Sequence, residues 1–406
     1  MSETTRHRFG SWGATAAIVL LAGAVPVALN LAADAAGSLN CSSGYQVDET
    51  LTNGARWQMC WERQLNEGIV LHDVTYTPIG GQPIEVLFRA SLAEIHVPYD
   101  NNGARFHDLS DYGLGYDWYI DDLQPGDCPN GDLLTDTTIN SNVLCQTEAP
   151  TGYAYKDYAQ QAQATSLNLF SVSHIGAYNY VVAWNFDDDG TIRPEVGATG
   201  SLQLYGGSPQ STWPMGGGNR AVAHMHNFYW RLDFDVDGAG NDRVEEMEAL
   251  PTNGRSQLRN TRRPFTSEVA RRVAPGGFRS WRVLDTVSDN ADGHPVSWEL
   301  LPNTDNIFRG PTYEPYSQNQ LYVTRNRLCE RFATHNVPTG NCRSSPNDSV
   351  AAFANGESLS NGQDLVVWYG ASFHHLPRDE DEDHMHPHWT GFSIVPRDLT
   401  ATNPAG

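Results

Sequence analysis

Two histidines separated by one residue, His224 and His226, are the side chains of this sequence best suited to hold a metal ion. They lie in residues 223–233 (AHMHNFYWRLD), where apolar and aromatic residues recur as in a β-strand. Side chains two apart on a strand project from the same face, so both imidazoles face one site. A third ligand must come from elsewhere, and the other dense histidine region is residues 374–378. The pattern indicates a copper site of three histidines; the alternative is that one or both of His224 and His226 are ordinary polar residues of a half-buried strand.

Alternating acids follow the histidine strand as Asp233, Asp235 and Asp237 in the sequence DFDVDG. This looks like the start of an EF-hand loop, but a strand precedes it and Val244 occupies position twelve, where glutamate is required. The stretch is therefore not an EF-hand. Alternating carboxylates still suit a hard cation such as calcium if a distant strand supplies another carboxylate. A solvated, Asp-rich hairpin turn is the alternative.

The elements that must position these residues are predicted to be mainly strands. Short runs rich in Val, Tyr, Trp and Phe are separated by Gly, Asn, Asp and Pro. One helix is expected at residues 267–274, with Pro275 as its stop. Because no repeat or low-complexity linker divides the chain between residues 56 and 396, we expect one large antiparallel β-sandwich with few short helices. The expected strands are residues 68–76, 84–92, 178–186, 201–205, 222–234, 321–324 and 364–373.

The first 35 residues have the pattern of an export signal. A basic start precedes an apolar run at residues 14–31, and Ala-Asp-Ala at residues 33–35 fits a small-x-small cleavage site. An uncleaved membrane anchor is the alternative, although a proline and an asparagine interrupt the apolar run. We expect the mature protein to be secreted, to the extracellular or periplasmic space. The expected organisation is a signal peptide at 1–35, a linker at 36–55, a catalytic-type domain at 56–400 and a tail at 401–406.

The charge of the chain bears on its partners. The formal net charge is -22. Such a surface disfavours nucleic acid as a partner, whereas it attracts cationic molecules towards the protein.

Six cysteines in an exported chain are expected to pair, because the destination is oxidising. Sequence alone allows fifteen connectivities. Pairing of neighbours is the simplest, and it joins Cys41 to Cys60, Cys128 to Cys145, and Cys329 to Cys342.

Several further stretches form a longer pattern in unbroken order. They are residues 67–74 (EGIVLHDV), 89–94 (RASLAE), 97–99 (VPY), 108–115 (DLSDYGLG), 174–180 (HIGAYNY), 189–192 (DGTI), 197–200 (GATG), 279–281 (RSW), 322–324 (YVT), 375–378 (HLPR), 380–381 (ED) and 391–392 (GF). Together with the histidine strand they resemble the catalytic domain of the copper-containing amine oxidases. The resemblance runs from about residue 56 to about residue 398, which makes it more specific than any single motif.

The resemblance implies roles for individual residues. The copper ligands of the family correspond to His224, His226 and His375. Tyr178 corresponds to the tyrosine that the family oxidises in place to topaquinone, with copper and dioxygen. Asp108 corresponds to the catalytic base, and Tyr99 to the hydrogen-bond partner of the quinone oxygen. The structural calcium site of the family corresponds to Asp233, Asp235, Asp364 and the carbonyls of Phe234 and Leu365.

The activity implied by the resemblance is oxidative deamination of a primary amine to an aldehyde, with release of ammonia and hydrogen peroxide. A homodimer is implied as well. A base such as Asp108 then needs a raised pKa and hence a desolvated pocket. The alternative is a non-catalytic, copper-binding descendant of the family with a structural or recognition role. Retention of Asp108 favours the enzyme, since a binding protein has no use for the base. The sequence does not indicate which amine is the substrate.

The chain departs from the family pattern around Tyr178. The family has Asn directly before this tyrosine and an acid directly after it, whereas this chain has Ala177 and Asn179, and His174 replaces the usual Thr. The Asn side chain helps to orient the ring, and alanine has no side-chain hydrogen bond to offer. Formation of the quinone therefore depends on some other restraint.

Three additional histidines, His384, His386 and His388, surround Met385, where the family pattern has none. An accessory metal-binding or proton-handling patch and a solvated polar loop are both compatible with this composition.

Overall fold

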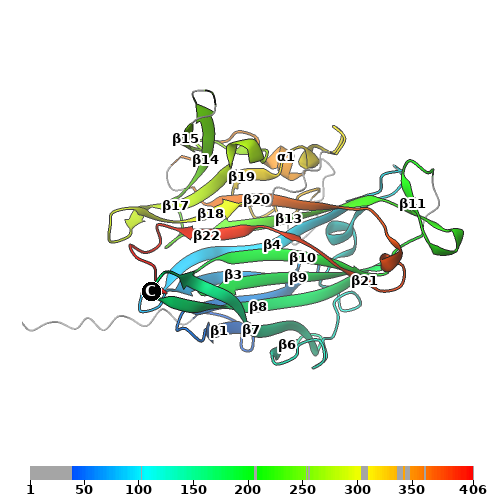
Figure 1. Cartoon of the computed structure of the whole chain (residues 1–406), viewed down its shortest axis with the longest axis horizontal. Coiled ribbons are helices and arrows are strands. Elements are labelled where there is room, and N and C mark those ends of the chain that lie inside the picture. Colours follow the sequence, from blue (N-terminus) through cyan, green and yellow to red (C-terminus); the bar gives the residue numbers. More distant parts are fainter. Residues whose placement is uncertain are drawn as a thin grey trace, which may run out of the picture. The chain divides into compact units, whose positions relative to one another are not determined.

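Two large antiparallel sheets, one of nine strands and one of eleven, make up most of the described chain (Figure 1). The computed structural model describes residues 39–101, 103–204, 208–252, 254, 257–302, 310–335, 342, 348–360 and 363–405. The predicted signal peptide therefore lies outside the described residues. The mainly antiparallel β fold with few short helices is confirmed.

The nine-stranded sheet carries the histidine strand at its centre. Its order is β1 (Gln46–Thr50), β2 (Arg56–Gln64), β3 (Gly68–Thr77), β4 (Ile84–Pro98), β13 (His224–Phe234), β20 (Leu365–His375), β19 (Leu321–Arg325) and β16 (Val269–Arg271), with β5 (Arg105–His107) paired to β4. β1 lies within residues 36–55, so this sheet begins inside the segment that we expected to be a linker.

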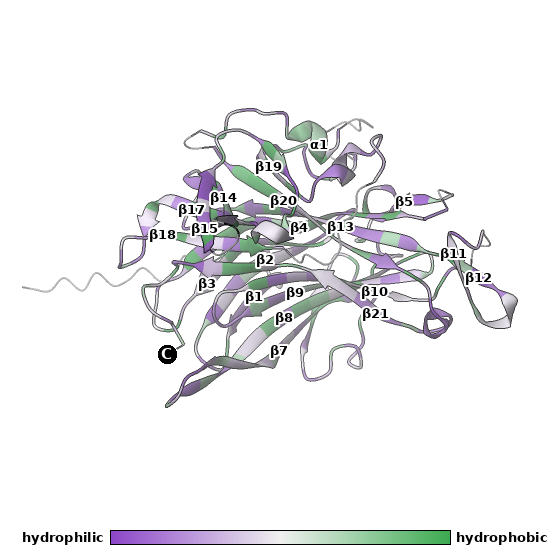
Figure 2. Cartoon of the chain, turned by 45° about the horizontal axis from the view of Figure 1, so that its top comes forward, coloured by the Kyte–Doolittle hydropathy of each residue, from purple (hydrophilic) through white to green (hydrophobic). Residues whose placement is uncertain are grey.

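The eleven-stranded sheet supplies the opposite wall. Its order is β15 (Gln257–Pro264), β14 (Asp242–Thr252), β17 (Ser280–Asp289), β18 (Pro295–Leu301), β22 (Ser393–Arg397), β10 (Ile192–Gly200), β9 (Tyr178–Asp187), β8 (Gln161–Ile175), β7 (Ser141–Lys156) and β6 (Asp132–Asp136), with β21 (Met385–Gly391) paired to β10. A separate hairpin joins β11 (Thr212–Pro214) to β12 (Arg220–Val222). Figure 2 shows hydrophobic and hydrophilic residues following one another along these strands.

Aromatic side chains from the two sheets meet in the core. Trp184 of β9 meets Trp230 of β13 edge to face, with ring centroids 5.0 Å apart. Trp57 of β2 packs on Phe186 of β9 at 4.9 Å, and its indole N–H donates to the carbonyl of Asp187. Each such aromatic pair contributes about 0.5–1.5 kcal/mol beyond the area it buries. The even-numbered faces of β9 and β13 are therefore packed against each other.

β13 is buried along its whole length, on both faces. Its odd-numbered side is covered by a second apolar cluster, in which Tyr229 packs near Tyr316 and Trp368. The short helix α1 (Val350–Phe353) belongs to the same cluster. This double coverage explains why residues 223–234 contain a nearly continuous apolar and aromatic run.

The helix predicted at residues 267–274 is wrong. Residues 269–271 form β16, which pairs with β19, and Ser267 bridges to Ser358. The carboxylate of Glu268 accepts backbone N–H bonds from Arg325 at 3.1 Å and from Asn355 at 3.0 Å. An isolated helix of this length is marginal in water, so pairing with a buried strand prevails.

The strand predicted at residues 201–205 is also wrong for residues 201–204, and residue 205 lies outside the described residues. Gly200 ends β10 with a φ of +107°, a backbone conformation that favours glycine. The backbone N–H groups that follow bind loops instead: Ser201 donates to Ala177, and Leu202 donates to Asp381. The other predicted strands are observed, and β4 extends six residues further, to Pro98.

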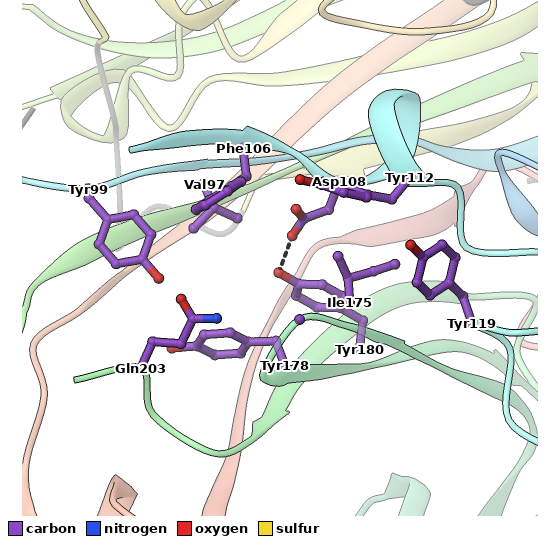
Figure 3. A pocket seen from close by; sticks show the side chains of 11 residues that line it. Val97, Tyr99, Phe106, Asp108, Tyr112, Tyr119, Ile175, Tyr178, Tyr180 and Gln203 are labelled. Carbon is purple, nitrogen blue, oxygen red and sulfur yellow. Dashed lines mark hydrogen bonds between the residues drawn. The ribbon is translucent and has the colours of Figure 1, made fainter. Parts of the chain in front are cut away.

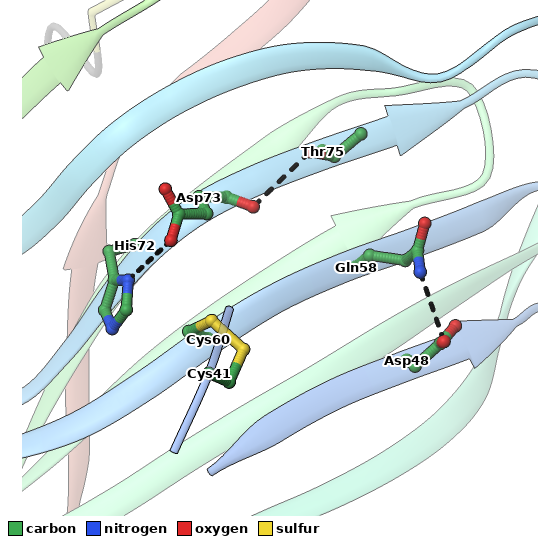
Figure 4. The surroundings of a disulfide bond; sticks show 7 residues. All are labelled: Cys41, Asp48, Gln58, Cys60, His72, Asp73 and Thr75. Atoms are coloured by element: carbon green, nitrogen blue, oxygen red, sulfur yellow. Dashed lines mark hydrogen bonds and ion pairs between the residues drawn. A yellow bond between two sulfur atoms is a disulfide. The ribbon is translucent and has the colours of Figure 1, made fainter. Parts of the chain in front are cut away.

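The three predicted disulfides are confirmed: Cys41–Cys60, Cys128–Cys145 and Cys329–Cys342. Cys41–Cys60 joins the residues before β1 to β2, beside His72 and Asp73 of β3 (Figure 4). Among the described residues, no helix is long and apolar enough to cross a membrane.

Candidate metal centre and adjoining pocket

Three buried histidines converge between the two sheets. β13 and β20 pair antiparallel with His224 directly opposite His375, and His226 lies two residues further along the same face of β13. One nitrogen of each ring lies within 4.8 Å of the others. All three side chains are at most 1% exposed. The structure thus brings together the three residues that the sequence suggested as metal ligands.

The hydrogen bonds of these rings leave nitrogens that suit a metal ion. His224 donates from Nδ1 to the carbonyl of Val222 at 3.1 Å, which leaves Nε2 without a proton. His375 bonds from Nε2 to Asp381 at 3.0 Å, which leaves Nδ1 without a proton. Neither ring nitrogen of His226 has a hydrogen-bond partner among the described residues. Buried polar atoms without a partner are costly, and a metal ion would satisfy them.

The electrostatics of the site keep the imidazoles neutral. Burial, followed by repulsion from His375, lowers the pKa of His224 to about 3. Burial and the neighbouring histidines lower the pKa of His226 well below its usual value. Metal ions bind the neutral imidazole, so no proton has to be displaced at neutral pH. The donor set of three neutral nitrogens therefore fits copper.

Tyr178 reaches the same nitrogens from the other sheet. Its hydroxyl lies 2.8 Å from Nε2 of His224 and 3.0 Å from Nδ1 of His375. The residue follows directly on the two-residue turn Gly176–Ala177 between β8 and β9, where Gly176 has a φ of +63°. Two-residue turns of this kind have glycine at their first position, so the turn fixes Tyr178 as the first residue of β9.

A pocket of about 270 Å³ adjoins Tyr178 (Figure 3). Its lining comes from β4 and the residue after it, and from β5. It also comes from the π-helical turn η1 (Asp108–Tyr112) and the segment that follows it, from the β8–β9 hairpin and from the segment after β10. The lining residues are Val97, Tyr99, Phe106, Asp108, Tyr112, Tyr119, Ile175, Gly176, Tyr178, Tyr180 and Gln203. An apolar and aromatic lining with a few polar groups is typical of a site for a small ligand.

Asp108 is the acid of this pocket, and it is 5% exposed. The hydroxyl of Tyr180 donates a hydrogen bond to its Oδ2 at 2.6 Å. Burial raises the pKa of Asp108 to about 7; the Tyr180 hydrogen bond opposes this rise, and the charges of Glu94 and Asp111 add to it. A carboxylate that titrates near neutral pH has the property expected of a general base.

Tyr99 lies at the end of β4, beside the first histidine. Its backbone forms an isolated bridge with His224, and its ring stacks on the His224 ring with centroids 4.6 Å apart. Figure 3 shows its hydroxyl directed toward Gln203 and Tyr178. The structure therefore places Tyr99, Asp108 and Tyr178 around one pocket.

Sequence reasoning missed Tyr180, Gln203 and Asp381. Tyr180 had a signal, because it lies two residues after Tyr178 and so shares its face of the strand. No sequence pattern indicated Gln203, because it belongs to an irregular segment. Its amide lies next to Tyr178 and Tyr99 in Figure 3. Asp381 was noted only as part of a matching motif, without its role of orienting His375.

The three additional histidines do not form one patch. His384 and His386 are exposed, whereas the ring of His388 lies 4.6 Å from that of His375. Nε2 of His388 lies 3.6 Å from Oδ1 of Asp381. His388 thus belongs to the surroundings of the metal centre.

The acids predicted to hold calcium lie at the opposite end of the paired strands β13 and β20. The register that places Asp233 opposite Val366 brings Asp235 close to Asp364 in the chain segment before β20. Oδ1 of Asp233 and Oδ1 of Asp235 are buried without a hydrogen-bond partner among the described residues. Burial raises the pKa of Asp233 to about 6 and that of Asp235 to about 7. Unpaired carboxylate oxygens of this kind fit a hard cation such as calcium.

Comparison with known proteins gives a consistent assignment. A family model described as "Copper amine oxidase, enzyme domain" matches residues 46–406. A primary amine oxidase of Arthrobacter sp. (strain P1) is 28% identical in an alignment of 375 residues that covers 83% of this chain and 57% of the relative. A histamine oxidase of Arthrobacter globiformis is 27% identical, over 86% of this chain and 56% of the relative.

Solved structures share the fold. A copper-containing benzylamine oxidase of Hansenula polymorpha superposes with a TM-score of 0.72 at 20% identity, covering 90% of this chain and 63% of that one. The amine oxidase of Aspergillus nidulans gives a TM-score of 0.70 at 23% identity, with 86% and 52% covered. The chain spans little more than half the length of the curated relatives that it matches.

Proposed function

Because the chain belongs to the copper amine oxidase family, we propose that it oxidises a primary amine with dioxygen and water, giving an aldehyde, ammonia and hydrogen peroxide. Copper would be held by His224, His226 and His375, and topaquinone would form from Tyr178. Amine oxidation is the activity named for the relatives, and the cluster of His224, His226 and His375 could hold the metal that the family uses.

One observation carries this proposal: the hydroxyl of Tyr178 lies within 3.0 Å of ligand nitrogens of both His224 and His375. The hydroxyl therefore stands beside the nitrogens that would hold copper, which is where a ring oxidised by copper and dioxygen has to lie. Copper bound there would supply, with dioxygen, the oxidation of this ring to a quinone, whose carbonyl is the electrophile for the amine nitrogen.

The other pocket residues act on the substrate proton. Asp108 would remove the proton from the carbon next to the amine nitrogen, because its carboxylate lies in the same pocket as Tyr178 and titrates at about pH 7. Tyr180 holds Oδ2 of Asp108, which fixes the orientation of the carboxylate. Asp108 is 5% exposed, so little water reaches its carboxylate.

Charge supports a cationic substrate, since a primary amine is protonated at neutral pH. The net charge of -22 attracts such molecules towards the protein and raises the rate at which they arrive. The pocket of about 270 Å³ and its aromatic lining favour a small amine with an apolar body.

The test is reconstitution of the copper-free protein under air. We expect one copper ion per chain, a visible quinone absorbance, and reaction with one phenylhydrazine per chain. Tyr178→Phe is the matched control, because it removes only the hydroxyl; this variant should bind copper without absorbing or reacting. A panel of primary amines, followed by peroxide release, then measures turnover.

The same experiment separates the enzyme from a non-catalytic copper-binding descendant. If wild type binds one copper ion per chain but, like Tyr178→Phe, never reacts with phenylhydrazine, the enzymatic proposal fails and the binding role takes its place. If wild type binds no copper, both proposals fail.

We further propose calcium at Asp233, Asp235 and Asp364, with the carbonyls of Phe234 and Leu365, supported by the unpaired carboxylate oxygens described above. Export is supported by the signal pattern and by three disulfides. N-terminal sequencing of the secreted protein tests the cleavage after residue 35. A homodimer follows from the family resemblance, and sedimentation analysis measures it.

A further inference from the structure

A second group of metal-binding side chains lies outside the pocket. It consists of His107 at the end of β5, Asp111 in η1 and His335 in the segment beyond β19. One ligand atom of each residue lies within 4.8 Å of the others. We call these three residues the outer triad.

The spacing of the outer triad allows its three side chains to surround a small ion. Nδ1 of His107 lies 3.6 Å from Oδ2 of Asp111, and Nε2 of His335 lies 3.3 Å from Oδ1 of Asp111. Two ligands of a tetrahedral zinc ion, each about 2.1 Å from the metal, are about 3.4 Å apart.

The second nitrogen of each imidazole is already engaged. Nε2 of His107 lies 3.2 Å from the hydroxyl of Tyr316. Nδ1 of His335 lies 3.4 Å from the hydroxyl of Thr334 and 3.5 Å from that of Ser110. Metal-binding histidines are typically oriented in this way, with one nitrogen fixed by a polar partner and the other presented to the ion.

A buried carboxylate holds this arrangement in place. Glu94 is fully buried, and its side chain accepts the hydroxyls of both Ser110 and Thr334. It also accepts the backbone N–H groups of Leu109 and Ser110 at 3.0 and 3.2 Å. The turn that carries Asp111 and the segment that carries His335 are thereby tied to the same strand, β4, so the triad is preorganised.

The outer triad is distinct from the proposed active site. Asp108 and Tyr112, on either side of Asp111 in η1, line the pocket, whereas none of the three triad residues does. Figure 3 shows the side chains of Asp108 and Tyr112 in the pocket lining, below and beside the turn. The triad therefore uses another face of the turn that positions Asp108.

We propose that His107, Asp111 and His335 bind a divalent transition metal ion, with zinc as the best fit. Two imidazoles and one carboxylate are a common donor set for zinc, and a site with three protein ligands keeps a position open for water. Asp111 is 48% exposed, so that position faces solvent. Hard cations such as calcium are disfavoured by the two imidazoles. This proposal does not depend on the proposed oxidase activity.

The experiment loads the full chain with one equivalent of copper, equilibrates it with zinc, removes free metal by gel filtration and measures both metals. We expect one copper and one zinc ion per wild-type chain. His335→Gln and Asp111→Asn should keep copper and weaken zinc binding at least about 10-fold, because each removes a ligand. His174→Gln is the matched control, since His174 pairs with Asp121 at 3.0 Å but belongs to none of the metal-ligand clusters among the described residues; it should keep zinc.

A second readout identifies the coordination. Cobalt replacing zinc should give the intense visible absorption of a tetrahedral site in wild type and in His174→Gln, but not in His335→Gln. The proposal is overturned if wild type retains no zinc, or if His335→Gln and Asp111→Asn retain as much zinc as wild type does. Loss of copper together with zinc in both variants would assign the triad a structural role, and would overturn it equally.

Discussion

Replacing Tyr180 by phenylalanine isolates the contact that sets the proton affinity of Asp108. The ring of Tyr180 is 1% exposed, and phenylalanine preserves its packing while removing the hydroxyl that donates to Oδ2 of Asp108 at 2.6 Å. This bond stabilises the carboxylate, so losing it raises the pKa of Asp108 above its present value of about 7. The active base is the deprotonated form, and the variant therefore needs a higher pH to act.

The size of the effect follows from the energy of the bond. A hydrogen bond to a charged group contributes about 1.5–3 kcal/mol. One pKa unit corresponds to about 1.4 kcal/mol, so the pKa of Asp108 should rise by about 1 to 2. Near pH 7 the ionised fraction then falls from about one half to between about one tenth and one hundredth, and the rate of proton removal falls about 5- to 50-fold. At about pH 9.5 the rates of variant and wild type should converge to within about 1.5-fold.

The assay is anaerobic stopped-flow reduction of the quinone by an accepted amine, measured across pH and normalised to the phenylhydrazine titre. Tyr119→Phe is the control, because it removes another hydroxyl of the same pocket lining. Asp108→Asn defines the limit: reduction should be slower by on the order of 10²-fold or more at every pH. If Tyr180→Phe and wild type have the same pH midpoint, the hydrogen bond does not tune the base and the reasoning is refuted.

Three further predictions concern the metals and the quinone. His375→Ala should lose stoichiometric copper while the protein stays folded, and full copper occupancy after dialysis would contradict the ligand assignment. Ala177→Asn should speed quinone formation or raise its yield after copper addition, in a phenylhydrazine time course. An unchanged time course would mean that another group, such as the nearby Gln203, already orients the ring. In calcium-free buffer the melting temperature should fall as pH rises from about 4 to about 7. The pKa of Asp235 is raised in the folded state, so the folded state binds the carboxyl proton more tightly than the unfolded state does. Calcium should reverse the fall in wild type but not in Asp235→Asn, and equal melting curves with and without calcium would exclude the site.

The sequence predicted the parts of the site that depend on local periodicity. His224 and His226 share a face because they are two apart on a strand, and that rule holds in any sheet. The positions of His375, Tyr178 and Asp108 came instead from resemblance to a family, because no local rule states which distant strand pairs with β13. The neighbour pairing of the cysteines held because each pair is separated by no more than 19 residues and closes a short loop.

What the sequence missed depends on contacts between distant segments. Residues 267–274 have a helical pattern, but the unsatisfied edge of β19 and the carboxylate of Glu268 draw them into a strand. Gln203 reaches the pocket from an irregular segment whose course is set by Gly200 and by hydrogen bonds to other loops. The outer triad joins residues 228 positions apart, so spacing alone gives no sign of it.

Because His224 and His375 lie directly opposite each other on paired strands, copper binding depends on the correct alignment of β13 and β20. A shift of the β13–β20 pairing by one residue would turn His375 to the other face of the sheet, leaving only His224 and His226 for the metal. A chain in which the two sheets are separated also cannot bring Tyr178 to these nitrogens. The fraction of chains that retain copper should therefore not exceed the fraction with correctly assembled sheets. The copper content of a purified sample thus sets a limit on the proportion of correctly aligned chains. Circular dichroism cannot do this, because a misaligned strand still gives a β spectrum.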